Sequence, residues 1–122
     1  MKIAVIGSRH ASGRAAAQIL KELPAYTSEI VSGGAAGTDT AAEQVALILS
    51  LPIKIFYPDY ARDGKAAPLM RNLEIIDYAD EVLAFWDGSS RGTQHVIAQC
   101  IRKGKPVRIV PLDPGNETHP LP

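Results

Sequence analysis

The chain has 122 residues, which is long enough to bury one hydrophobic core without disulfides or metals. Its 13 acidic and 13 basic side chains balance, so no overall field attracts nucleic acid, and we expect nucleic acid not to be a partner. The single cysteine excludes an internal disulfide and a cysteine-based metal site. No apolar run approaches the ~20 residues of a membrane span, and the N-terminus is typical of a first strand rather than a signal peptide. We therefore expect a cytoplasmic protein without a membrane partner.

The first half of the chain contains three apolar, β-prone runs, over residues 2–6, 29–32 and 53–56. After the first run, Ser12 can cap a helix that extends to about Leu23. After the second run and a glycine-rich turn, Thr38 or Asp39 can cap another helix. The spacing predicts two apolar helix faces, made of Ala16, Ile19, Leu20 and Leu23 in the first helix and of Ala41, Val45, Ile48 and Leu49 in the second.

The third run is followed by a segment without hydrophobic periodicity. Residues 57–66 contain proline, aspartate and glycine, and predict a loop. Pro68 suits the first turn of a helix that runs to about Tyr78. The residues of this helix that we expect to face inward are Leu69, Leu73 and Ile76.

The alternation of strands and helices continues to the end of the chain. A strand over residues 81–86 precedes a helix that ends before Gly104, and a last strand covers residues 107–110. We expect one domain over residues 1–111 and a flexible tail over residues 112–122. This pattern predicts an α/β protein with a mainly parallel, five-stranded sheet that helices cover on both faces.

Three of the predicted strands end in loops rich in glycine and hydroxyl groups. These loops read GSR at residues 7–9, SGGAAGTD at residues 32–39 and WDGSSRGT at residues 86–93. Because parallel strands end at the same edge of a sheet, the loops are expected to lie together. Ligands of such sheets bind beyond the carboxyl ends of the strands, so we expect a binding site there.

The chemistry of these loops suits a phosphorylated nucleotide. Helix N-termini and arginines bind phosphate, carboxylates and amides bind ribose hydroxyls, and aromatic rings stack on bases. The candidates are the hydroxyls of Ser8, Ser32, Thr38, Ser90 and Thr93, the cations Arg9, Arg71, Lys65 and Arg91, the carboxylates and amide of Asp39, Asp87 and Asn72, and the rings of Trp86 and Tyr57. Two alternatives remain open, since Asp39 could serve only its helix dipole and Trp86 could belong to the core.

Motifs of several enzyme classes are absent. The sequence has no HExxH, no cluster of metal ligands, no GxSxG and no Gly-Lys-Ser/Thr after its glycines. We therefore expect neither a metal site nor ordinary ATP hydrolysis. Cys100 lies among apolar residues of a predicted helix, which indicates a buried, inert thiol.

Four motifs, IGSR, VSGGAAGTDTAAE, GKAAPLMRN and ADEVLAFWDGSSRGT, occur in the order typical of one superfamily. On these motifs, residues 1–110 resemble the SLOG superfamily, in particular its small YspA/YpsA-like branch. The resemblance implies a Rossmann-like, three-layer α/β/α fold, a pocket for a nucleotide or nucleotide-derived ligand, and self-association. The binding residues that it implies are Gly7, Ser8, Arg9, Gly33, Gly34, Gly37, Asp39, Arg71, Asn72, Gly92 and Thr93.

Two related groups imply competing functions. The LOG-type phosphoribohydrolases cleave the N-glycosidic bond of a nucleoside monophosphate, and carry a glutamate in the helix after their second glycine loop. Here the loop continues as Gly92-Thr93-Gln94-His95-Val96, without that glutamate. The DprA/Smf DNA-processing proteins share a GSR…SGxAxGxDxxAH pattern with the first half of the chain, where Glu43 replaces the histidine.

We therefore expect a module that binds a nucleotide-derived ligand as a sensor or carrier. The alternative is a nucleotide N-glycosidase that uses Asp39 or Asp87, and single-stranded DNA binding is the third interpretation. Nearby N–H groups and arginines should favour the ionised form of both aspartates, so neither is expected to be an effective general acid.

Overall fold

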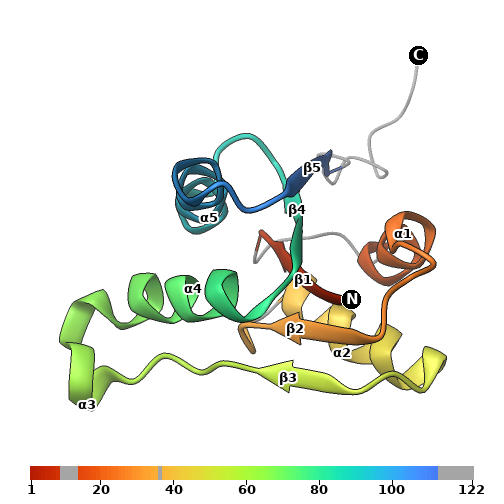
Figure 1. Ribbon diagram of the computed structural model, residues 1–122, viewed down its shortest axis with the longest axis horizontal. Coiled ribbons are helices and arrows are strands. Elements are labelled where there is room, and N and C mark those ends of the chain that lie inside the picture. Colours follow the sequence, from red (N-terminus) through yellow and green to blue (C-terminus); the bar gives the residue numbers. More distant parts are fainter. Residues whose placement is uncertain (9–13, 36, 113–122) are drawn as a thin grey trace.

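The computed structural model describes residues 1–8, 14–35 and 37–112, which form a parallel sheet between two layers of helices (Figure 1). The elements are β1 (Lys2–Gly7), α1 (Ala15–Glu22), β2 (Glu29–Ser32), α2 (Thr38–Leu49), β3 (Ile53–Ile55), α3 (Tyr60–Asp63), the 3-10 turn η1 (Gly64–Ala66), α4 (Ala67–Tyr78), β4 (Glu81–Trp86), α5 (Arg91–Lys103) and β5 (Val107–Pro111). The strand order is β3-β2-β1-β4-β5, and every neighbouring pair is parallel. The predicted α/β, Rossmann-like fold is confirmed.

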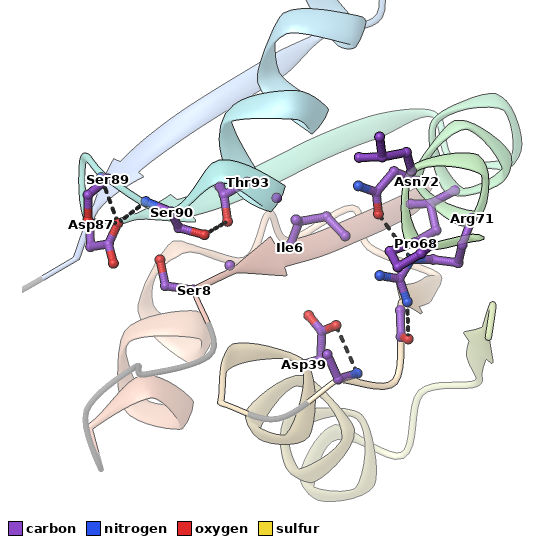
Figure 2. A pocket seen from close by; sticks show the side chains of 16 residues that line it. Ile6, Ser8, Asp39, Pro68, Arg71, Asn72, Asp87, Ser89, Ser90 and Thr93 are labelled. Atoms are coloured by element: carbon purple, nitrogen blue, oxygen red, sulfur yellow. Dashed lines mark hydrogen bonds between the residues drawn. The ribbon is translucent and has the colours of Figure 1, made fainter. Parts of the chain in front are cut away.

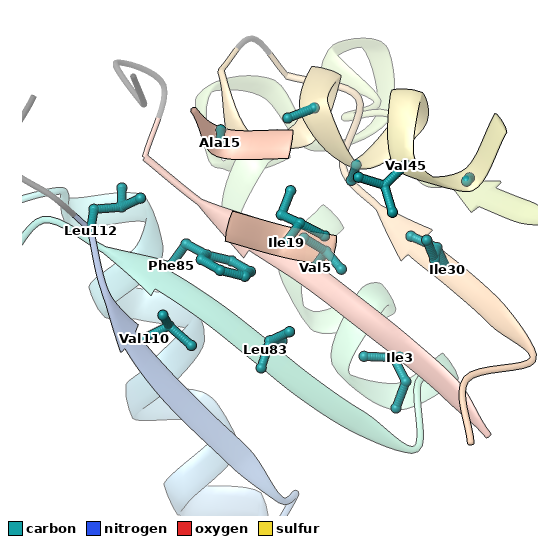
Figure 3. Close-up of a cluster of buried hydrophobic side chains, with 13 residues drawn as sticks. Ile3, Val5, Ala15, Ile19, Ile30, Val45, Leu83, Phe85, Val110 and Leu112 are labelled. Atoms are coloured by element: carbon teal, nitrogen blue, oxygen red, sulfur yellow. The ribbon is translucent and has the colours of Figure 1, made fainter. Parts of the chain in front are cut away.

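Both faces of the sheet are buried, which explains why its strands are apolar on both sides. Ile3 and Val5 of β1 belong to a cluster with α1 and α2, while Ala4 and Ile6 belong to a cluster with α4 and α5. Figure 3 shows the first cluster, in which side chains from α1 and α2 lie on the sheet. Cys100 is in the second cluster, and burial raises the pKa of its thiol to about 11, as expected for an inert core cysteine.

The strand order reverses at the centre of the sheet. From β1 the chain runs outward through β2 to β3, and then returns to the other side of β1 with β4 and β5. In parallel sheets a crevice opens at such a reversal, beyond the carboxyl ends of the strands. The loops after β1, β2 and β4 all lie at this edge, as the sequence predicted.

Residues 57–66 are not the loop that we expected, because they contain α3 and η1. Asp59 caps α3, since its Oδ1 accepts a hydrogen bond from the N–H of Arg62 at 3.0 Å. A helix of one turn is too short to show a hydrophobic repeat, so its cap was the only signal in the sequence.

The predicted apolar faces of the helices are wrong at four positions. The exposed residues that we expected to be buried are Leu20, Ile48, Leu49 and Leu69. In α2 the buried arc passes through Ala42, Val45 and Ala46, and Ile48 lies outside it. Leu69 is in the first turn of α4, at the carboxyl edge of the sheet, where the helix borders a pocket instead of the core.

The last strand also extends beyond its predicted end. Pro111 closes β5, and Leu112, which we placed in a flexible tail, is buried in the first cluster. The N–H of Leu112 donates to the carbonyl of Trp86 at 2.9 Å. Residues 113–122, the remainder of the predicted tail, lie outside the described residues. Within the described part of the chain, no helix is long and apolar enough to cross a bilayer.

Candidate functional site

A pocket of about 400 Å³ lies at the carboxyl edge of the sheet, between the loops after β1, β2 and β4 and the start of α4 (Figure 2). Its lining residues are Ile6, Gly7, Ser8, Gly33, Ala35, Asp39, Pro68, Leu69, Arg71, Asn72, Ile75, Asp87, Ser89, Ser90, Gly92 and Thr93. The volume is within the range of small-molecule sites, which are roughly 300–1,000 Å³.

The floor of the pocket is formed where β1 meets the start of α2. The hydroxyl of Thr38 donates to the carbonyl of Ser8 at 3.2 Å, and a Cβ at Gly7 would overlap the Thr38 side chain. This close approach explains the glycine at position 7. Ser8 itself is only 2% exposed. Its Oγ makes no hydrogen bond of ordinary geometry among the described residues, but it lies close enough to the Asp87 carboxylate to help lower the pKa of that group.

The N-terminus of α2 differs from the prediction, because neither Thr38 nor Asp39 caps it. The N-cap is Gly37, with a φ of 74°, and no side chain accepts from the first turn. Asp39 instead turns back, and its Oδ2 accepts a hydrogen bond from the N–H of Ala35 at 3.1 Å. The carboxylate therefore holds the glycine-rich loop and faces the pocket (Figure 2).

The protonation of Asp39 is also contrary to the prediction. Burial raises the pKa of this carboxyl from 3.8 to about 6. The N–H groups of Ala35 and Gly33 and the Arg71 charge act in the opposite direction, and Glu43 adds to the rise. Burial dominates because Asp39 is only 5% exposed and its Oδ1 has no partner within the described residues.

Arg71 and Asn72 connect three walls of the pocket. Arg71 donates from Nη1 to the carbonyl of Gly33 at 2.6 Å and from Nε to Oδ1 of Asn72 at 3.0 Å. The Asn72 amide nitrogen lies 3.4 Å from Nδ1 of His95, whose pKa is lowered by burial and secondarily by Arg102. Arg71, expected to bind phosphate, thus also fixes the glycine-rich loop to α4.

The loop before α5 is organised by Asp87. Its Oδ1 accepts from the N–H groups of Ser89 at 2.9 Å and Ser90 at 2.7 Å, and these bonds hold the pKa of Asp87 below its usual range. Asp87 is exposed, unlike Asp39. The N-cap of α5 is Ser90, which makes no side-chain cap bond; its Oγ lies 3.3 Å from the hydroxyl of Thr93.

Ten of the predicted binding residues line this pocket, namely Gly7, Ser8, Gly33, Asp39, Arg71, Asn72, Asp87, Ser90, Gly92 and Thr93. Five residues of the three loops do not, namely Ser32, Gly34, Gly37, Thr38 and Trp86, and neither do the further candidates Tyr57, Lys65 and Arg91. Arg9, like the predicted cap residue Ser12, lies outside the described residues. Whether the lining residues bind a ligand stays a prediction.

The five excluded residues support the loops around the pocket. Ser32 Oγ accepts from the N–H of Gly34 at 3.3 Å, and Trp86 donates from Nε1 to the carbonyl of Ser90 at 3.0 Å. Gly34 has a φ of 72°, and a Cβ there would overlap the ring of Tyr57. Trp86 is half-buried at the end of β4 and belongs to neither buried cluster, and its indole N–H holds the loop before α5.

Sequence reasoning missed six lining residues: Ile6, Ala35, Pro68, Leu69, Ile75 and Ser89. Most are apolar, and no motif distinguishes them from core residues. Alternation along β1 could have found Ile6, because it points to the same face as Ala4. Among the described residues, no three His, Cys, Asp or Glu side chains gather closely enough to hold a metal.

Comparison with known proteins identifies relatives of this chain. A family model described as DNA recombination-mediator protein A matches residues 1–63. The Gene 61 protein of Mycobacterium phage D29 is 33% identical over 88 residues, which cover 67% of this chain and 70% of the phage protein.

Two solved structures share the fold. DNA processing protein A from Helicobacter pylori, described for its single-stranded DNA binding mode, has a TM-score of 0.73 at 23% identity, covering 96% of this chain and 70% of that protein. DNA processing protein A from Streptococcus pneumoniae has a TM-score of 0.74 at 22% identity, covering 90% of this chain. The chain spans only 50% of the Streptococcus pneumoniae protein.

These matches correct one expectation and refine another. The expectation that nucleic acid is not a partner is wrong, because the Helicobacter pylori relative binds single-stranded DNA. It failed because a balanced total charge does not describe the charge at one edge of the sheet. The YspA/YpsA-like branch stays a prediction. The family model covers residues 1–63, and the phage relative is 33% identical over 67% of this chain. The chain therefore belongs to the DNA recombination-mediator protein A family.

Proposed function

We propose that this chain binds single-stranded DNA at the carboxyl edge of its sheet, with one phosphate at the N-terminus of α5. Membership of the DNA recombination-mediator protein A family supports the partner. The observation that carries the proposal is the N-terminus of α5, where no side chain caps the first N–H groups and no acidic residue lies in the first turn; the buried hydroxyl of Ser8 lines the same pocket.

The N-terminus of α5 is suited to an anion. Its first N–H groups, at Arg91, Gly92 and Thr93, have no acceptor within the helix, as in any α-helix. No side chain caps them, and the first turn contains no acidic residue. The helix dipole therefore favours negative charge there.

The N-terminus of α2 faces the same pocket but is not suited to phosphate. Asp39 occupies its first turn and places a carboxylate at the pocket wall. Like charges repel in a partly buried site, so a phosphate is expected to avoid this side. The α2 side of the pocket is therefore acidic, while the α5 side presents uncapped N–H groups together with the ionised carboxylate of Asp87 in the preceding loop.

An exposed aromatic ring beside the pocket supports a strand over a free nucleotide. Tyr57 is 66% exposed, and its ring lies against Gly34. The residues on either side of Gly34 in the sequence, Gly33 and Ala35, line the pocket. Stacking of a base on such a ring contributes about 1–3 kcal/mol and accepts any base. Tyr57 could hold the neighbouring base of a strand whose phosphate lies in the pocket.

Fluorescence anisotropy with a labelled oligothymidylate tests the proposal. The chain should bind it and should bind a duplex of equal length more weakly. Ser8→Ala should weaken binding by about 1.5–3 kcal/mol, the contribution of a hydrogen bond to a charged group. Because Ser8 Oγ makes no hydrogen bond of ordinary geometry within the described residues and is only a minor cause of the low pKa of Asp87, this change should alter the melting temperature little.

A matched pair of variants on α5 tests the position of the strand. Arg91 is exposed in the first turn and Arg102 is exposed in the last. Arg91→Ala should reduce the slope of log affinity against log salt by about 0.7, the value for one phosphate of a single strand. Arg102→Ala should leave the slope unchanged. Equal effects of both variants, or no binding at all, would contradict the proposal.

A free nucleotide is the second candidate, and the size of the pocket favours it. A thermal-shift screen of mono-, di- and cyclic nucleotides and ADP-ribose derivatives tests this function. Ligand at 100 times its dissociation constant should add about 2.7 kcal/mol of stability. A nucleotide that stabilises the chain, when no oligonucleotide binds, would favour this candidate over DNA.

A further inference from the structure

Phosphate binding does not explain why Oδ1 of Asp39 is buried at the pocket wall without a hydrogen-bond donor among the described residues. Asp39 is only 5% exposed, and Figure 2 shows its side chain pointing from α2 toward the cavity. Its Oδ2 accepts the N–H of Ala35, whereas Oδ1 has no partner among the described residues. A buried carboxylate oxygen without a donor is unfavourable, so a role in the loop alone does not account for it.

If Asp39 only held the glycine-rich loop, a neutral asparagine at this position would be sufficient. The single oxygen of asparagine could accept the Ala35 N–H, and its neutral amide would carry no charge into the pocket. Aspartate differs from asparagine here by presenting a second acceptor, on the side that faces the cavity. This second acceptor is therefore available to a donor group of a ligand.

The donor can be identified by its chemistry. An anion is repelled, so the group is not a phosphate oxygen. The Watson–Crick edge of guanine offers two parallel donors and prefers both oxygens of a carboxylate, but Oδ2 is already engaged. A single O–H group fits one free oxygen, and carboxylates commonly bind sugar hydroxyls in nucleotide sites.

We propose that Oδ1 of Asp39 accepts a hydrogen bond from a sugar hydroxyl of the nucleotide in the pocket. The proposal rests on nucleotide binding at this edge. An internal deoxynucleotide has no free sugar hydroxyl, so the pocket prefers the end of a DNA strand, or a ribonucleotide, to the interior of a DNA strand. Asp39 is then the residue that decides which nucleotide of a strand enters.

Oligonucleotides of equal charge test this preference. An internally labelled oligothymidylate is compared in four forms: with both terminal hydroxyls, with a 3′-terminal dideoxynucleotide, with a 5′-deoxy end, and as the all-ribose strand. Loss of the recognised hydroxyl should weaken binding about tenfold to a hundredfold. The form that loses affinity identifies the end, and a tighter ribose strand identifies the 2′-hydroxyl.

The variant Asp39→Asn should abolish the discrimination among these forms. Its one side-chain oxygen accepts from Ala35, so an NH₂ donor faces the cavity in place of an acceptor. Glu43→Gln is the matched control, since it removes the same charge from an exposed position of α2. The control should discriminate as the native chain does. Circular dichroism and melting curves confirm that both variants fold.

The outcomes separate this inference from the proposed function. If the native chain binds all four forms equally, or if Asp39→Asn discriminates among them as the native chain does, the role of Asp39 is wrong while DNA binding stands. If no strand binds, the same comparison is made by calorimetry with a nucleoside monophosphate and its 2′,3′-dideoxy form. Equal affinity, or none, for these two also overturns the inference.

Discussion

The ionisation of Asp39 gives a prediction about stability that needs no ligand. Its pKa is about 6 in the folded chain, against 3.8 as the ordinary value. Between these two pH values the folded state holds a proton that the unfolded state has released. The free energy of unfolding that this group contributes is therefore fully present below about pH 4 and is lost as the pH rises through 6.

The size of the loss follows from the pKa. A difference of about two pH units corresponds to roughly 3 kcal/mol. Asp39→Asn removes this dependence, because asparagine does not ionise. Relative to the native chain, the variant should therefore gain up to about 3 kcal/mol in free energy of unfolding between pH 4 and pH 7.5. The Ala35 hydrogen bond can persist in the variant, so this comparison isolates the charge.

Urea unfolding of both proteins at several pH values measures the difference. Comparing how the free energy of unfolding changes with pH, rather than its value at one pH, cancels any constant effect of the amide. Glu43→Gln serves as the control. Because Glu43 contributes less than burial to the raised pKa of Asp39, this variant should reduce the pH dependence only slightly. If the native chain and Asp39→Asn show parallel curves from pH 4 to 7.5, the buried carboxylate has an ordinary pKa and the argument is refuted.

Three further predictions concern the packing and chemistry around the pocket. In urea unfolding, Gly7→Ala should destabilise the fold by about 1–3 kcal/mol, because its Cβ would overlap Thr38. In the same assay Gly92→Ala should be neutral or stabilising, because a Cβ there meets nothing within 4 Å. Leu112→Ala should cost about 2–5 kcal/mol in the same assay, because Leu112 is buried in the core; an unchanged midpoint would place it outside the core. Chromatography should detect no base released from nucleoside monophosphates over hours, because the glutamate of the LOG-type phosphoribohydrolases is missing after Gly92-Thr93 and Asp87 is held ionised. Asp39, with a pKa of about 6, is the one carboxyl of the pocket suited to act as a general acid, so release that Asp39→Asn abolishes would identify an enzyme.

Local signals in the sequence were sufficient to predict the sheet. Each strand is an apolar run flanked by glycine, proline or polar residues, and such runs identify buried parallel strands. The gathering of Ser8, Asp39 and Thr93 followed from parallel topology alone, because all three come after strands that end at one edge. Local patterns could not reveal α3, whose only sequence signal is the cap at Asp59.

Properties that depend on packing were not predictable. The pKa of Asp39 depends on how deeply α2 sits against β1, and burial outweighed the N–H group and arginine that the sequence shows nearby. Leu69 was expected in the core because it shares a helix face with Ile76. At the first turn of α4 this face leaves the core and borders the pocket, so Leu69 is exposed while Ile76 is buried.

The most direct test of the account is a nuclear magnetic resonance titration of the native chain with unlabelled oligothymidylate. Binding at the carboxyl edge should shift the amide signals of Ser8, Gly92 and Thr93. Tyr26 and Arg108 line a second pocket at the opposite edge of the sheet, and their signals should not move. Shifts confined to that opposite edge, or no shifts at saturating oligonucleotide, would contradict single-stranded DNA binding at the pocket.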